Sequence, residues 1–188
     1  RVLPSRGPKR RECSGQSLGI SAASMSRNAV YVCERLQSAG FEAYIVGGAV
    51  RDALLGVVPK DFDVVTDARP EQIKREFRRA FIIGRRFRLV HVIFGDEPIE
   101  VSTFRANRSV SDNVYGNQLE DATRRDFTVN ALYYDPLADR VVDYVGALKD
   151  IKTRTLRVIG EPDLRYREDP VRMLRAVRLA VKLDCRIA

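Results

Sequence analysis

Apolar positions recur along the chain at two spacings, one typical of helices and one typical of strands. After Ser26 they fall three and four residues apart, which predicts an amphipathic helix with that serine as its N-cap and Gly40 as its end. The apolar residues of this helix are Ala29, Val32, Cys33 and Leu36. We therefore expect the organised domain to begin at residue 26.

The rest of the chain alternates between strand and helix patterns. Strands are expected at residues 44–46, 61–65, 81–83, 89–94, 99–104, 140–144 and 156–159. Helices are expected at residues 49–55, 70–79, 121–134 and 169–183, the last with an apolar stripe of Val171, Leu174, Val177 and Val181. The polar residues 105–120 predict a mobile loop. We expect more protein to follow the last helix.

Charge and cysteine content narrow the function classes. The chain has 33 Lys and Arg against 25 Asp and Glu, a net charge of +8, which favours a polyanionic partner such as nucleic acid or a nucleoside triphosphate. Residues 1–25 predict a flexible basic arm. No apolar run long enough for a membrane span or a signal peptide is seen. The 3 cysteines are scattered and fit reduced thiols in a cytoplasmic protein.

Three carboxylates are candidates for a metal site. Asp61 and Asp63 lie two apart in an expected strand, so their side chains should share one face. Glu100 lies inside another apolar strand, where a buried charge needs a partner. If the two strands are neighbours, the three groups can hold Mg²⁺ or Mn²⁺. The alternatives are a solvated strand end for the aspartates and an arginine partner for Glu100.

Two segments are suited to a nucleotide. Gly47 and Gly48 lie between a strand and a helix, where backbone N–H groups can approach a triphosphate, and Arg51 adds positive charge. Arg51 pairing with a nearby carboxylate is the alternative. In residues 124–130, Asp126 and Asn130 lie one helical turn apart and suit ribose hydroxyls or an ordinary contact with each other.

Basic residues occur at two further places. On the last helix, Arg172 and Arg175 suit a base edge or phosphate, or a solvated face, and Asp169 suits an N-cap. A compact turn at residues 84–88 offers donors to nucleic-acid phosphate or triphosphate through Arg85, Arg86 and Arg88. His91, the single histidine, is expected to be structural.

Several motifs taken together resemble a known family. They are GGAVRD at residues 47–52, DFD at 61–63, RRDFTVN at 124–130 and EDPVR at 168–172. Their order resembles that of the class II polymerase β-like nucleotidyltransferases, which include the tRNA CCA-adding enzymes and the bacterial poly(A) polymerases. Residues 82–92, IIGRRFRLVHV, resemble a stretch that marks the poly(A) polymerases, so we favour poly(A) addition.

The resemblance implies an α+β fold, a mixed five-stranded head with helices on one face, at residues 26–157, followed by the start of a helical neck at 158–188 without its RNA-binding body. It implies Mg²⁺-dependent transfer of AMP from ATP to RNA 3′ ends, as in RNA polyadenylation. Asp61, Asp63 and Glu100 would hold the metals. Gly47, Gly48 and Arg51 would hold the triphosphate, Asp126 the ribose, and Asp169 and Arg172 the base.

Three functions are compared. The first is a poly(A) polymerase head in a monomeric enzyme, and the second is a CCA-adding enzyme with the same chemistry. The third is a basic RNA-binding module without catalysis. The acidic trio disfavours the third, because a polyanion binder gains nothing from clustered carboxylates at its site.

Overall fold

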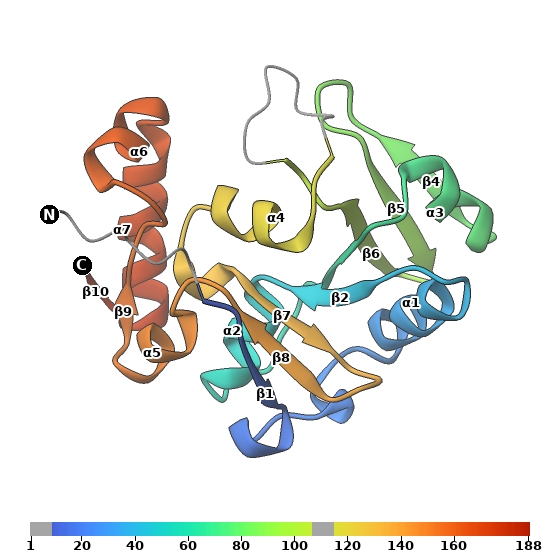
Figure 1. The fold of residues 1–188 in the computed structure, drawn as a ribbon, viewed down its shortest axis with the longest axis horizontal. Coiled ribbons are helices and arrows are strands. Elements are labelled where there is room, and N and C mark those ends of the chain that lie inside the picture. The colour runs from blue at the N-terminus through green and yellow to red at the C-terminus, as the bar shows by residue number, and fades with distance from the viewer. Residues whose placement is uncertain (1–8, 107–114) are drawn as a thin grey trace, which may run out of the picture.

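The computed structural model describes residues 9–106 and 115–188, and its centre is an eight-stranded mixed sheet (Figure 1). In sheet order its strands are β1 (Arg11–Ser14), β8 (Arg140–Asp143), β7 (Leu132–Asp135), β2 (Ala43–Val46), β3 (Asp63–Thr66), β6 (Glu97–Thr103), β5 (Leu89–Phe94) and β4 (Ala80–Ile83). The β3–β6 pair is parallel and the other neighbours are antiparallel. The predicted mixed sheet is confirmed, with eight strands in place of the expected five.

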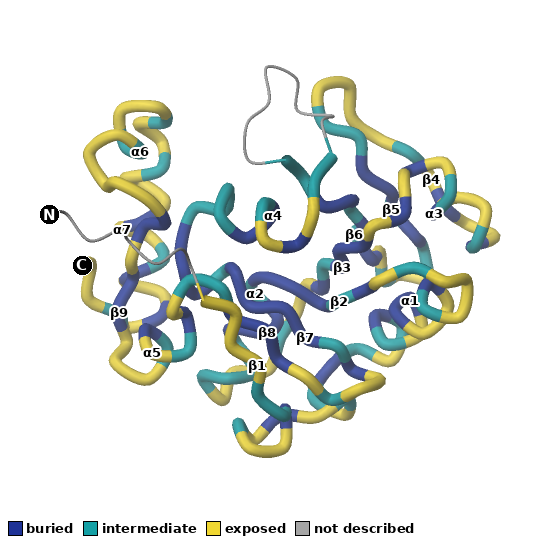
Figure 2. Tube along the Cα trace, in the orientation of Figure 1, coloured by how far each residue is buried: buried dark blue, intermediate teal, exposed yellow. Residues whose placement is uncertain are grey.

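Three helices cover one face of this sheet. In α1 (Arg27–Ser38) the Ser26 hydroxyl accepts a hydrogen bond from the Ala29 N–H at 3.3 Å, as the predicted N-cap requires. Residues of α1, α2 (Gly48–Leu54) and α3 (Pro70–Glu76) join the main core with the strand residues Val64 and Val101. Figure 2 shows burial concentrated along the central strands.

A fourth helix, α4 (Gln118–Arg124), packs on the opposite face, so the expectation of helices on one face is corrected. Its Ala122 joins a smaller core in which Val46, Val65 and Tyr133 are buried. Alternate strand residues point to opposite faces. The α4 face therefore carries the side chains that alternate with those of the main core.

The helix predicted at residues 121–134 is confirmed at residues 121–124 and wrong beyond them. Helix α4 ends at Arg124, a single 3₁₀ turn follows at Thr128–Asn130, and β7 begins at Leu132. The apolar residues of this segment suit either structure by spacing. Pairing of β7 with both β2 and β8 decides for the strand, because it buries Tyr133 and Tyr134 completely.

The described part of the N-terminal arm, residues 9–25, is ordered. Residues 1–8 lie outside the described part, but β1 pairs antiparallel with β8 at one sheet edge. Short 3₁₀ turns follow at Gln16–Leu18 and Ala22–Ser24, and Ile20 and Met25 are buried. The expectation of a flexible segment is thus wrong for residues 9–25. The sequence did not reveal this order, because a strand held by backbone pairing needs no periodic apolar pattern.

The C-terminal part forms a helical layer beside the sheet (Figure 1). It contains α5 (Ala147–Lys152), α6 (Pro162–Glu168), α7 (Val171–Leu183) and a short parallel pair of β9 (Thr155–Leu156) with β10 (Arg186–Ile187). Ala176 and Ala180 of α7 pack against Phe127 and Leu156. The predicted boundary between residues 157 and 158 stays a prediction.

The apolar stripe predicted for α7 faces outward. Val171, Leu174, Val177 and Val181 are 59%, 61%, 49% and 80% exposed. Small alanines make the inward contact instead, which lets the helix approach its neighbours closely. No helix of residues 9–106 and 115–188 is long and apolar enough to cross a membrane.

Candidate functional site

Two carboxylates lie side by side on the α4 face. Asp63 of β3 and Glu100 of β6 are paired in the parallel register. Paired residues on neighbouring strands project to the same face. Burial raises the pKa of Asp63 to about 7, and the charge of Glu100 and a side-chain hydrogen bond to it add to this. The pair therefore favours a cation or a proton between its oxygens.

Asp61 lies just before strand β3. Strand β3 begins at Asp63, and Phe62 is buried, so Asp61 lies exposed before the strand. Its charge contributes to the raised pKa of Asp63. Within the described part of the chain, no group of 3 or more His, Cys, Asp or Glu side chains is close enough to hold a metal ion. The expectation that three carboxylates converge is not met in this arrangement.

The two paired carboxylates nevertheless fit a hard divalent cation. Adjacent ionised carboxylates repel, and Mg²⁺ or Mn²⁺ prefers oxygen ligands. The raised pKa of Asp63 records that repulsion together with burial. With two protein oxygen donors, the remaining ligands would come from water or phosphate, as is common for Mg²⁺.

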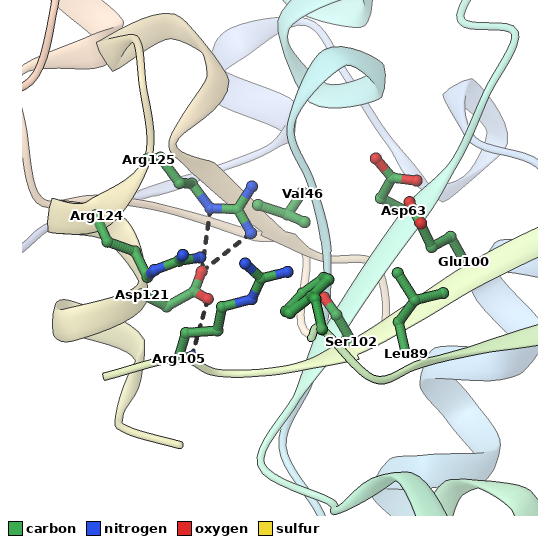
Figure 3. A pocket seen from close by; sticks show the side chains of 10 residues that line it. Val46, Asp63, Leu89, Glu100, Ser102, Arg105, Asp121, Arg124 and Arg125 are labelled. Carbon is green, nitrogen blue, oxygen red and sulfur yellow. Dashed lines mark hydrogen bonds and ion pairs between the residues drawn. The ribbon is translucent and has the colours of Figure 1, made fainter. Parts of the chain in front are cut away.

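A hollow of about 170 Å³ opens above this pair. Its walls are formed by Val46, Asp63, Phe87, Leu89, Glu100, Ser102, Arg105, Asp121, Arg124 and Arg125. Figure 3 shows the carboxylates on one side and the guanidinium groups of Arg105, Arg124 and Arg125 on the other. Opposite charges thus face each other across one small space.

A buried carboxylate holds the basic side in place. Asp121, 3% exposed, accepts hydrogen bonds from the Tyr133 hydroxyl at 2.6 Å and from Arg125 Nε at 3.0 Å. It also accepts one from the Arg105 backbone N–H at 3.2 Å. Sequence reasoning did not single out Asp121, Tyr133 or Arg105. The four-residue spacing of Asp121 and Arg125 was a usable signal for their ion pair.

The glycine pair and Arg51 form a separate unit. Gly47 has φ 80° and ψ −138°, a conformation that favours glycine. Arg51 is buried, donates to Asn130 Oδ1 at 2.7 Å and pairs with Asp52 at 3.0 Å. The alternative of a local ion pair is therefore present in the structure. Arg51 joins α2 to the 3₁₀ turn that carries Asn130, and its triphosphate role stays a prediction.

A second hollow, of about 250 Å³, brings other predicted residues together. It is lined by Asp126, Phe127, Asn130, Arg175, Arg178, Leu179 and Lys182. Asp126 forms an ion pair with Arg175 of α7 and accepts a hydrogen bond from Asn130 Nδ2 at 3.5 Å. The two residues do not share a helix, but the predicted contact between them exists.

Asp169 and Arg172 line neither hollow. Asp169 Oδ1 accepts a hydrogen bond from the Val171 N–H at 3.1 Å, but the N-cap of α7 is Pro170, one residue after the N-cap foreseen as an alternative. Arg172 donates to the Arg165 carbonyl oxygen at 2.9 Å. Arg165 in turn donates to the Arg125 carbonyl oxygen at 2.9 Å, which joins α6 to the end of α4.

The basic turn at residues 84–88 reaches the first hollow through Phe87, which lies under the Arg105 guanidinium. Arg88 pairs with Glu71 at 2.6 Å, whereas Arg85 and Arg86 are exposed.

His91 belongs to the same neighbourhood. It pairs with Glu100 in the β5–β6 register, and its Nε2 is 4.0 Å from Glu100 Oε1. The predicted structural histidine thus borders the carboxylate pair. Alternation along its strand puts His91 on the face of Leu89 and Ile93, but the sequence does not show the strand order that places it beside Glu100.

Comparison with known proteins assigns this arrangement to a family. The chain belongs to the poly A polymerase head domain family, which matches residues 43–157. It is 55% identical over 182 residues to poly(A) polymerase I of Haemophilus influenzae, covering 88% of this chain and 40% of that protein. It is 41% identical over 162 residues to the CCA-adding enzyme of Lactobacillus helveticus, covering 82% and 40%.

A solved structure agrees with this assignment. The Bacillus stearothermophilus CCA-adding enzyme in complex with CTP superposes with a TM-score of 0.79 at 36% identity, covering 87% of this chain and 42% of that chain. The chain therefore spans about two fifths of the length of the relatives it matches.

Proposed function

We propose that the protein, at its natural full length, is an RNA 3′-end nucleotidyltransferase that adds AMP from ATP. The observation that carries this proposal is the pair Asp63 and Glu100 facing three arginines across one hollow. In the proposed reaction the RNA 3′ oxygen attacks the α-phosphorus of ATP, and the bond to the bridging oxygen breaks to release pyrophosphate.

The acidic side would position the reacting hydroxyl. Asp63 and Glu100, with Asp61 next to them, are the proposed ligands of Mg²⁺ or Mn²⁺. When bound, such ions lower the pKa of the attacking hydroxyl and neutralise charge on the departing pyrophosphate. The fixed strand register keeps the two carboxylates at one place, so no reorganisation is needed at the moment of reaction.

The basic side would bind the triphosphate. Arg105, Arg124 and Arg125 supply planar donors that match phosphate oxygens, and Asp121 fixes the orientation of Arg125. Their charge would also stabilise pyrophosphate as it leaves. Gly47, Gly48 and Arg51 remain proposed contacts to the nucleotide, as do Asp126, Asn130 and Arg175 around the second hollow, with Asp169 and Arg172 at the base.

ATP is the proposed substrate because the poly(A) polymerase relative is more similar to the chain than the CCA-adding relative, at 55% against 41% identity. CCA addition is the second candidate, favoured by the overlay on an enzyme solved with CTP.

An extension assay with the full-length protein separates the two. We expect ATP alone to extend unrelated RNAs by many residues. CTP incorporation followed by arrest after CCA on tRNA would assign the second function, and no incorporation with RNA binding retained would favour a non-catalytic module.

A further inference from the structure

The row of side chains that contains the carboxylate pair continues to the edge of the sheet. Glu100 pairs with His91 on β5, and His91 pairs with Phe81 on β4. Residues paired across strands share a face, and neighbouring strands are about 4.8 Å apart. His91 and Phe81 therefore extend the catalytic face outward from Glu100. We call these two residues the edge track.

Phe81 presents an aromatic ring to solvent on this face. Its side chain is 53% exposed, whereas Ile82, which points the other way, packs against the main core. Strand β4 is the last strand of the sheet, at the end remote from α7 (Figure 1). Ile83, two residues further on the same face, is also exposed at 39%. Folding alone gives no reason for this exposed apolar surface.

The charge around the edge track suits a polyanion. Arg79 precedes β4, and Arg85 and Arg86 follow it, all three exposed. Single-stranded nucleic acid binds where aromatic rings accept stacked bases and nearby cations meet the backbone phosphates. Both components are present at β4, and they are continuous with the carboxylate pair.

The two sides of the first hollow suit two different substrates. Its arginine side is the proposed place of the triphosphate. The RNA 3′ end must then approach Asp63 and Glu100 from another direction, and the edge track lies on the Glu100 side, away from the β2 side.

We propose that the edge track binds the last nucleotides of a single-stranded RNA 3′ end, with the rings of Phe81 and His91 stacking on bases. This inference rests on the proposed function, because it assigns the RNA half of the same site. An acidic peptide that adds a strand to β4 is the competing occupant of this edge.

The first test measures binding of a fluorescein-labelled oligoadenylate to the full-length protein without nucleotide. Stacking on one aromatic side chain is worth about 1–3 kcal/mol, so Phe81→Ala and His91→Ala should each weaken binding about tenfold. Phe81→Trp should restore it, while Leu137→Ala, at a similarly exposed apolar position on the β7–β8 hairpin, should leave it unchanged. The KM for ATP should not change in Phe81→Ala.

A second test uses RNA with 2-aminopurine as its last or second-last base. Stacking quenches this base, so the wild type should quench it and Phe81→Ala should not. Unchanged affinity and quenching in both alanine variants would overturn the edge track. The edge track would also be overturned if the alanine variants lost binding to an acidic peptide and kept their affinity for RNA.

The outcomes also separate the two proposals. If the wild type extends RNA with ATP and the edge variants bind RNA normally, the edge track is wrong and the proposed function stands. If the wild type quenches and binds RNA but incorporates no nucleotide, the proposed function fails and the RNA site remains.

Discussion

Asp63 lies beside Glu100 because the two residues occupy paired positions on adjacent parallel strands. The strand register, and not a flexible loop, brings their charges together. Burial and that proximity raise the pKa of Asp63 from 3.8 to about 7. The two carboxylates therefore lower the stability of the fold when both are ionised. Such a loss of stability is typical of a functional site, here one suited to binding a cation.

The first prediction concerns stability of the metal-free protein. The folded chain holds the Asp63 proton more tightly than the unfolded chain, so this group lowers stability as pH rises from 3.8 to about 7. In EDTA, Asp63→Asn should melt at a higher temperature than the wild type at pH 8, with a smaller difference at pH 5. Differential scanning fluorimetry checks this. A lower melting temperature for the variant at pH 8 would contradict it.

The second prediction concerns the buried network around Asp121. Tyr133→Phe removes the 2.6 Å hydrogen bond to this carboxylate. Hydrogen bonds to charged groups contribute about 1.5–3 kcal/mol, so urea unfolding should show a loss of that order. Tyr31→Phe is the matched control because the Tyr31 side chain is 47% exposed, and its stability should be unchanged. Equal stability of the two variants would refute the network's structural role.

The third prediction concerns the arginine side of the hollow. Arg124→Ala should raise the KM for ATP about tenfold, because a charge-assisted bond to phosphate contributes about 1.5–3 kcal/mol. Affinity for RNA without nucleotide should stay within about twofold. Arg140→Ala, which removes an exposed arginine from β8, is the control. Loss of RNA affinity with an unchanged KM for ATP would reverse the assignment of the two substrates.

The fourth prediction concerns the turn that carries Phe87. Gly84 has φ 90°, and a Cβ there would lie 2.0 Å from the Phe87 carbonyl oxygen. Gly84→Ala should therefore shift the turn and lower ATP-dependent extension. Gly95→Ala, with φ 58° and no neighbour within 4 Å, carries the backbone cost alone, about 1 kcal/mol. Equal activity of the two variants would show that the turn's position is not needed.

Elements that have a signal within a few residues of sequence were predicted correctly. The Ser26 cap, the glycine turn at Gly47 and the strands at β5 and β6 were all predicted, because capping chemistry and alternation act over a few residues. Strand β1 was missed, since an edge strand held by backbone pairing needs no apolar pattern.

Contacts that depend on the order of strands in the sheet could not be predicted from the sequence. The register that places His91 beside Glu100, and the contact of Tyr133 with Asp121, join residues 9 and 12 apart through different elements. The segment around Tyr133 was predicted as helix because its apolar spacing suits both structures. The apolar stripe of α7 was predicted from helical spacing alone, which does not show that Ala176 and Ala180 make the contact with the core.

The most direct measurement is the single-turnover rate of AMP incorporation at an RNA 3′ end by the full-length protein carrying Asp63→Asn or Glu100→Gln. Mutation of a residue that hydrogen-bonds to a metal ligand typically lowers metal affinity or activity about 10–100-fold. Loss of a ligand itself should therefore slow AMP incorporation by about 100-fold or more. RNA affinity should be retained, and Asp96→Asn, at an exposed turn, should react like the wild type. Normal rates in both carboxylate variants would contradict the assignment of Asp63 and Glu100 as metal ligands of the reaction.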